Sequence, residues 1–148
     1  MDSVHNDNVR SSSSVHILVV EDFVPFQQYI ISILATERGL EVIAGVSDGL
    51  EAVQKAKELK PDLILMDIGL PSLSGIEAAR RIRKAVPEAK VVFLSQESSV
   101  DVIQMALNTG ASAYVVKANA ETELLEAVRT ALRRNQPDSN VQASPIES

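Results

Sequence analysis

The chain has 148 residues, of which 45% are hydrophobic and 23% charged, and this indicates a single domain with an apolar core. It contains no cysteine, which excludes disulfides, thiolate catalysis and cysteine-ligated zinc or iron–sulfur centres. The net charge of −6 at pH 7 has the wrong sign for a protein that gains affinity by neutralising DNA phosphates, so we expect no direct binding of nucleic acid.

The two ends of the chain differ in composition from the part between them. Residues 1–14 are polar, end in four consecutive serines and lack the apolar centre of a signal peptide. Residues 135–148 are also polar and show no periodicity, so we expect two disordered tails around a folded domain at residues 15–134. Because no apolar run reaches the length of a membrane span, we expect a soluble cytoplasmic protein with no membrane partner.

Five short runs rich in valine, isoleucine and leucine are typical of strands that are buried on both faces of a sheet. They are Ile17–Val20, Val42–Val46, Leu63–Met66, Val91–Leu94 and Tyr114–Val116. After each run, apolar residues recur at the spacing of an amphipathic helix. The alternation predicts an α/β fold in which a doubly wound, five-stranded parallel sheet is flanked by five helices.

Residues that favour helix boundaries agree with this alternation. Pro25 suits the first turn of the first helix, and Ser74 suits the cap of the third. Gly39 and Gly110 follow the first and fourth helices, where a left-handed residue is usually glycine. Pro61 lies where the second helix has ended.

Four of the five runs stop at polar side chains, namely Glu21 with Asp22, Asp67, Ser95 and Lys117. Because ligand sites of open parallel sheets form at the carboxyl ends of strands, we expect these side chains to converge. Three gathered carboxylates would repel one another without a cation, and oxygen ligands in an open site favour Mg²⁺. The pattern therefore predicts a site for Mg²⁺ and a phosphoryl group.

Asp67 is our candidate for a nucleophile that attacks phosphorus and carries the phosphoryl group covalently. Lys117 would neutralise a phosphoryl oxygen, and Ser95 would donate a hydrogen bond to another. Each residue taken alone also has an ordinary explanation, as a turn aspartate, a solvated amine or a turn serine. Tyr114, three residues before Lys117, is either a switching ring or a packing residue.

In order and spacing, these residues resemble the receiver domain of a two-component response regulator, across most of the chain. The resemblance rests on Glu21 with Asp22, Asp67 with Leu70, Pro71 and Gly75, Ser95, Gly110 with Ala111, and Tyr114 with Lys117. It implies a flavodoxin-like strand order of 2-1-3-4-5. It also implies that Asp67 accepts a phosphoryl group from a sensor histidine kinase or a phosphotransfer protein.

The resemblance further assigns roles around Asp67. Asp22 and Asp67 would ligate Mg²⁺ directly, Glu21 would act through water, and the backbone carbonyl of Gly69 would add a ligand. Ser95 and Tyr114 would form a switch that reports phosphorylation to the surface of the fourth helix, the fifth strand and the fifth helix. The output would be a downstream protein target or self-association, including a phosphorylation-dependent homodimer. Such a protein is no enzyme beyond its own phosphorylation and dephosphorylation.

Residues 46–52 and 75–78 resemble the NarL/FixJ-like subfamily, whose receivers usually precede a helix-turn-helix DNA-binding domain. The stretch after Arg134 is too short for such a domain. We therefore expect a stand-alone receiver, and the alternative is the receiver part of a truncated DNA-binding transcription regulator.

Three positions depart from the pattern of the family. Glu21 stands where aspartate is commoner, Gln96 where a small residue usually follows the switch serine, and Ala118 where many receivers have proline. Gln96 would crowd the approach to Asp67 and slow the entry of phosphodonor or attacking water. A cis bond before Ala118 would cost about 2.5–4 kcal/mol, so we expect a trans bond and a shifted lysine.

Two functions from other classes compete with a phosphorylated receiver. A phosphatase or phosphotransferase of the haloacid dehalogenase kind needs a second aspartate two residues after its nucleophile, where this chain has Gly69, and it needs a cap domain. A receiver-like binding module that is never phosphorylated stays open, chiefly because of Gln96. The presence of Asp22, Asp67, Ser95 and Lys117 argues against that module.

Overall fold

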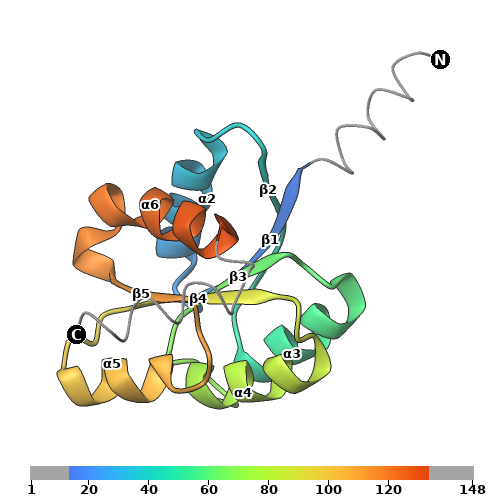
Figure 1. Ribbon diagram of the computed structural model, residues 1–148, viewed down its shortest axis with the longest axis vertical. Helices are drawn as coiled ribbons and strands as arrows, with labels where there is room; N and C mark the ends of the chain where they lie inside the picture. The colour runs from blue at the N-terminus through green and yellow to red at the C-terminus, as the bar shows by residue number, and fades with distance from the viewer. Residues whose placement is uncertain (1–13, 134–148) are drawn as a thin grey trace.

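The computed structural model of the protein describes residues 14–133, which form one parallel sheet covered by helices (Figure 1). The sheet has the order β2-β1-β3-β4-β5, which confirms the doubly wound α/β fold and its flavodoxin-like order. The strands are β1 (Val15–Val20), β2 (Leu40–Val46), β3 (Leu63–Met66), β4 (Lys90–Ser95) and β5 (Ala113–Val116). Apart from Ser14, the expected tails lie outside the described residues.

Two helical layers enclose the sheet. Figure 1 shows α2 and α6 over one face and α3, α4 and α5 over the other. The helices are α2 (Val24–Ala35), α3 (Gly49–Leu59), α4 (Gly75–Ala85), α5 (Val100–Leu107) and α6 (Ala120–Arg133), with the short 3₁₀ helix η1 (Lys117–Asn119) after β5. None of these helices has both the length and the apolar character that crossing a membrane requires.

Each face of the sheet has its own apolar core. Successive side chains of a strand point to opposite faces, so Leu18 packs towards α3 and α4 while Val19 packs towards α2 and α6. Phe93 of β4 is fully buried in the core on the side of α3 and α4. Leu124 of α6 is fully buried in the core on the side of α2 and α6. Burial on both faces explains why the strands read as continuous apolar runs.

The helix boundaries follow the local signals in the sequence. Pro25 lies in the first turn of α2, and the Ser74 hydroxyl accepts a hydrogen bond from a backbone N–H in the first turn of α4. Gly39 and Gly110 have φ angles of 93° and 96°, the left-handed geometry that glycine tolerates. The end of α3 lies directly before Pro61, as predicted, and its capping residue Lys60 has a left-handed φ of 47°.

Candidate functional site

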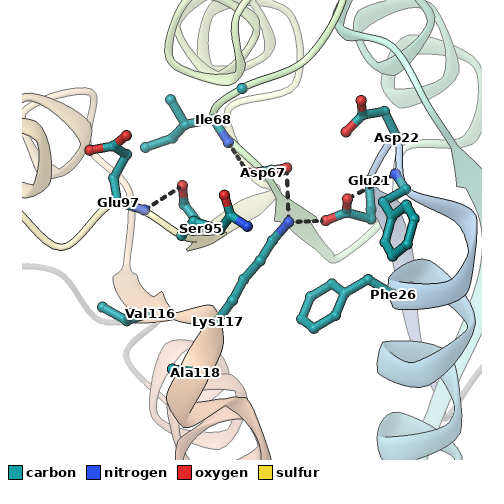
Figure 2. A pocket seen from close by; sticks show the side chains of 13 residues that line it. Glu21, Asp22, Phe26, Asp67, Ile68, Ser95, Glu97, Val116, Lys117 and Ala118 are labelled. Carbon is teal, nitrogen blue, oxygen red and sulfur yellow. Dashed lines mark hydrogen bonds and ion pairs between the residues drawn. The ribbon is translucent and has the colours of Figure 1, made fainter.

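The carboxyl ends of β1, β3, β4 and β5 border one cleft of about 680 Å³ (Figure 2). Parallel register aligns Val20 with Met66 and Ser95 with Val116, so the residues that follow emerge at the same edge of the sheet. The structure thereby brings together the five side chains that the strand ends singled out. They are Glu21, Asp22, Asp67, Ser95 and Lys117, all of which line the cleft.

Burial separates this cluster from ordinary surface charges. Among the described residues, the buried polar or charged side chains are Glu21, Asp67 and Ser95, with 3%, 7% and 2% of their surface exposed. Burying a carboxylate is costly unless it is paired and hydrogen-bonded. Keeping these polar groups buried in the cleft therefore costs free energy, whereas an exposed turn residue would have no such cost.

Asp67 is held by contacts on both of its carboxylate oxygens. Oδ1 accepts a hydrogen bond of 2.7 Å from the backbone N–H of Ile68, and Oδ2 lies 3.1 Å from Nζ of Lys117. A Cβ at Gly75 would lie only 1.9 Å from the backbone oxygen of Asp67. Glycine at that position is what lets α4 begin directly against the strand end that carries Asp67.

Lys117 connects two carboxylates of the cleft. Its Nζ lies 2.7 Å from Oε1 of Glu21 as well as 3.1 Å from Oδ2 of Asp67. Burial lowers the pKa of Lys117, but the hydrogen bond to Glu21 and the charge of Asp67 outweigh it and raise the pKa above its ordinary value. The lysine is therefore an ammonium at neutral pH. The bond before Ala118 is trans, since the described residues contain no cis peptide bond.

Glu21 is fixed by its side chain and by its backbone. Oε2 accepts a hydrogen bond of 2.9 Å from the backbone N–H of Phe23, while Oε1 contacts Lys117. The amide of Gln27 donates to the backbone oxygens of Glu21 and Val46, at 3.0 and 3.1 Å. Burial raises the pKa of Glu21, and the Lys117 hydrogen bond acts in the opposite direction.

Two contributors to the site, Phe26 and Gln27, were given no role in it by the sequence analysis. The ring of Phe26 lies 4.7 Å from Nζ of Lys117, measured to the ring centroid. Both residues belong to the first turn of α2, directly after the acidic pair. A strand end that leads straight into a helix is a signal for such contacts, because the first helical turn faces the same edge of the sheet.

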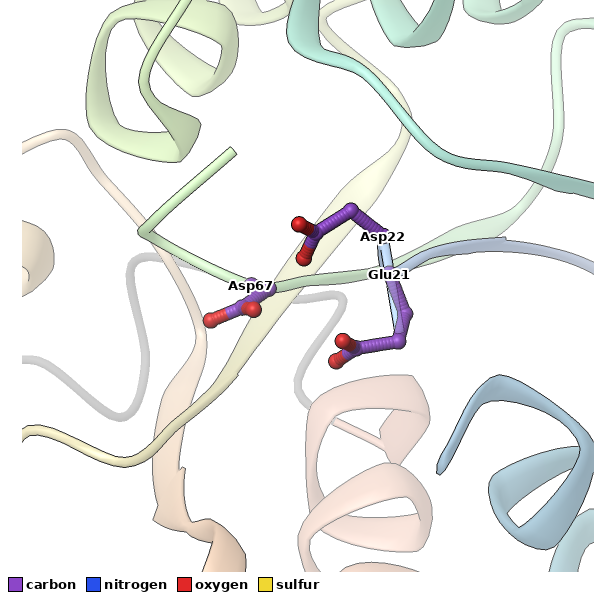
Figure 3. A group of neighbouring side chains, drawn as sticks. All are labelled: Glu21, Asp22 and Asp67. Carbon is purple, nitrogen blue, oxygen red and sulfur yellow. The ribbon is translucent and has the colours of Figure 1, made fainter. Parts of the chain in front are cut away.

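The three carboxylates form a compact group of oxygen ligands (Figure 3). One oxygen from each of Glu21, Asp22 and Asp67 lies within 4.8 Å of the others. Asp22 is exposed, so the group opens to solvent on one side. The group offers only oxygen ligands, carries the negative charge of carboxylates and is open on one side. These residues therefore fit Mg²⁺. Gly69 lines the same cleft.

Ser95 and Tyr114 both contact the backbone of Glu97, in the loop after β4. The Ser95 hydroxyl accepts a hydrogen bond of 3.3 Å from the Glu97 N–H, and the Tyr114 hydroxyl donates to the Glu97 carbonyl at 2.8 Å. The Tyr114 ring packs against Phe93 with 6.2 Å between centroids. Burial raises the pKa of the Tyr114 phenol, so its hydroxyl stays a donor at neutral pH.

Comparison with known proteins gives a consistent result. The family model described as "Response regulator receiver domain" matches residues 17–129. The response regulator protein VraR of Staphylococcus saprophyticus is 34% identical over 115 residues, which cover 78% of this chain and 55% of VraR. The transcriptional regulatory protein DegU of Brevibacillus brevis is 36% identical over 124 residues, covering 84% of this chain and 52% of DegU. The chain thus spans about half the length of these curated relatives.

Solved structures agree with the sequence relatives. The response regulator domain of Thermotoga maritima CheB superposes with a TM-score of 0.76 at 34% identity, covering 81% of this chain and 97% of that domain. A LuxR-family two-component response regulator from Aurantimonas sp. SI85-9A1 gives a TM-score of 0.78 at 30% identity, covering 82% of this chain and 86% of the other.

Proposed function

The chain belongs to the family of response regulator receiver domains, and from this premise we propose that Asp67 accepts a phosphoryl group from a sensor histidine kinase or a phosphotransfer protein. The observation that carries the proposal is the environment of Asp67. Its carboxylate is buried at a strand end, lines the cleft, and lies against a partly buried ammonium and a backbone N–H. These groups can position the carboxylate and neutralise charge that develops on phosphoryl oxygens.

In the proposed reaction an oxygen of Asp67 forms the new bond to phosphorus while the bond from phosphorus to the donor breaks. The leaving group departs with that electron pair and takes up a proton. Lys117 neutralises a transferred oxygen, and the hydroxyl of Ser95 donates to another. Water can later attack the acyl phosphate in the same geometry, so the protein would also catalyse its own dephosphorylation.

We propose Mg²⁺ as the cation of the acidic group. Asp22 and Asp67 would ligate it directly, Glu21 through water, and Gly69 through its backbone carbonyl. When bound, Mg²⁺ supplies positive charge that stabilises the phosphoryl oxygens during transfer.

The proposed output is a population shift in the loop after β4. A phosphoryl group on Asp67 offers Ser95 a stronger acceptor and draws its hydroxyl away from Glu97. Tyr114, which holds the carbonyl of Glu97, is then free to change its position with the loop. The surface of α5, β5 and α6 would report this change to a downstream protein or to a second copy of the chain in a phosphorylation-dependent homodimer.

Exposed apolar side chains on α5 support a protein partner at this surface. They are Val100, Met105 and Leu107. The proposal assigns the output to protein contacts in the cytoplasm and not to direct contact with nucleic acid, in line with the net charge of −6.

The test is incubation of the purified protein with acetyl phosphate, with and without Mg²⁺, beside the Asp67→Asn variant. We expect one phosphoryl mass by intact mass spectrometry, dependent on Mg²⁺ and absent in the variant. A simultaneous change of size in gel filtration would identify self-association as the output. If neither acetyl phosphate nor a kinase produces an adduct although Mg²⁺ binds, the chain is instead a binding module that is not phosphorylated.

A further inference from the structure

We propose that Phe26 is a positioning residue for Lys117, and that its ring and the Glu21 carboxylate hold the ammonium in an arrangement with which Mg²⁺ has to compete. The inference deepens the proposed function and rests on it, because Lys117 and the cation serve the same reaction. It assigns a role in the site to the first turn of α2.

The ring contact has the geometry of a cation–π interaction. Nζ of Lys117 lies 4.7 Å from the centroid of Phe26, inside the range in which an ammonium is attracted to an aromatic face. The Lys117 side chain is only 15% exposed, so water screens the attraction weakly. Phe26 packs against the core beneath α2 and α6, and this packing limits where the ring that faces the ammonium can lie.

Glu21 completes the arrangement on the side of β1. Its Oε1 makes the shorter of the two carboxylate contacts of Lys117, and its Oε2 is held by a backbone N–H. Glutamate is needed for this reach, because an aspartate would retract the carboxylate by up to about 1.5 Å, the length of one C–C bond. Figure 2 shows Glu21 and the Phe26 ring on the same side of the Lys117 amine, and Asp67 beside them.

The competition follows from shared carboxylates. Lys117 contacts Glu21 and Asp67, which are two of the three carboxylates of the proposed cation site. A divalent cation among these carboxylates repels the ammonium and competes with it for their negative charge. Whatever stabilises Lys117 at its present position therefore lowers the affinity of the site for the cation. Phe26 would have this effect although it is not one of the proposed ligands.

The experiment is calorimetric titration of Mg²⁺ into the unphosphorylated full chain, with four proteins compared. They are the wild type, Phe26→Leu, Phe26→Tyr and Tyr29→Leu. Leucine keeps apolar volume but has no aromatic face, so we expect Phe26→Leu to bind Mg²⁺ about two- to fivefold more tightly. Phe26→Tyr keeps the face and should match the wild type, as should Tyr29→Leu, which removes a ring that does not face the lysine.

A second measurement reads the contact itself. In the wild type, the ring current of Phe26 should shift the NMR signals of the Lys117 ε-methylene protons upfield, and saturating Mg²⁺ should reduce that shift. Phe26→Leu should remove it, and Phe26→Tyr should preserve it. An unshifted lysine in the wild type, or Mg²⁺ affinities that are equal in the wild type and Phe26→Leu, would overturn the inference.

Both measurements use unphosphorylated protein, which separates this inference from the proposed function. If Phe26→Leu leaves Mg²⁺ binding unchanged while acetyl phosphate still labels the wild type, the role of Phe26 is refuted and Asp67 remains the acceptor. If no adduct forms but Phe26→Leu tightens Mg²⁺ binding, the phosphoacceptor role fails and the competition between Lys117 and the cation stands.

Discussion

The ammonium of Lys117 lies 3.1 Å from Oδ2 of Asp67, although the two residues are 50 positions apart and strand β4 separates their strands in the sheet. The lysine side chain extends from the end of β5 across β4 to reach the end of β3. One oxygen of Asp67 is thus paired with an ammonium and the other with a backbone N–H. A phosphoryl group on Asp67 would find both donors already in place.

Replacing Lys117 tests its proposed role in transfer. We expect Lys117→Ala to slow phosphorylation by acetyl phosphate about 10²-fold, because preorganised stabilisation of developing charge is lost. Lys117→Arg keeps the charge but presents a planar fork in place of a compact ammonium, so it should restore only part of the rate. The measurement is the rate of adduct formation by intact mass, and equal rates in Lys117→Ala and wild type would exclude the role.

Gln96 offers a test of access to the site. Its exposed side chain lines the cleft that contains Asp67. We expect Gln96→Ala to speed both phosphorylation by acetyl phosphate and hydrolysis of the adduct, because a smaller side chain leaves more room for the donor and for water. Gln54→Ala, on the outer surface of α3, serves as a control for the loss of an amide. Unchanged rates in Gln96→Ala would show that the side chain does not limit entry.

Tyr114 tests the connection between β5 and the loop after β4. Tyr114→Phe removes the hydroxyl that donates to the Glu97 carbonyl and keeps the packing on Phe93. We expect the free energy of unfolding to fall by about 0.5–1.5 kcal/mol, the usual net worth of one hydrogen bond, as measured by urea denaturation. Amide hydrogen exchange should rise in the loop after β4 and stay unchanged in β1, and a uniform rise would contradict a local role.

Gly75 tests the contact between α4 and the strand that carries Asp67. Gly75→Ala would place its Cβ 1.9 Å from the Asp67 backbone oxygen, so the backbone has to shift. We expect a loss of about 1–3 kcal/mol in the free energy of unfolding, as for other overpacked sites. Gly69→Ala is the matched control for stability, since nothing lies within 4 Å of a Cβ there. Similar stabilities of the two variants would contradict the prediction.

The pair of Glu37 and Arg129 predicts a pH dependence of stability. Two hydrogen bonds of 3.1 Å from the guanidinium join α6 to the segment after α2 and hold the pKa of Glu37 below its ordinary value. A depressed carboxylate pKa stabilises the fold above the pKa of the unfolded state, which is about 4.3, and this contribution disappears as the pH falls through the folded pKa.

We therefore expect the wild type to be more stable than Glu37→Gln at neutral pH, by an amount that shrinks below about pH 4.3. Thermal unfolding from pH 7 to pH 3 measures the difference. Glu126→Gln is the control, because Glu126 contacts the same arginine through one exposed, local ion pair. A difference that is constant over this pH range would show that the pair does not stabilise the fold.

The elements of the fold were predictable because their signals are local. Buried strands require apolar runs, helices require apolar positions at helical spacing, and caps such as Ser74 act within one turn. Errors were confined to boundaries. For example, β2 begins at Leu40, two residues before the predicted Val42.

By itself the sequence determined which polar side chains follow the strands, because a buried strand ends where its run of apolar residues ends. Tertiary structure alone decided what those side chains touch. The bridge from Lys117 to Glu21, the ring of Phe26 at the ammonium and the joint hold of Ser95 and Tyr114 on Glu97 join separate elements. Such contacts depend on strand pairing and on side-chain rotamers selected by packing, and no local pattern in the chain specifies either.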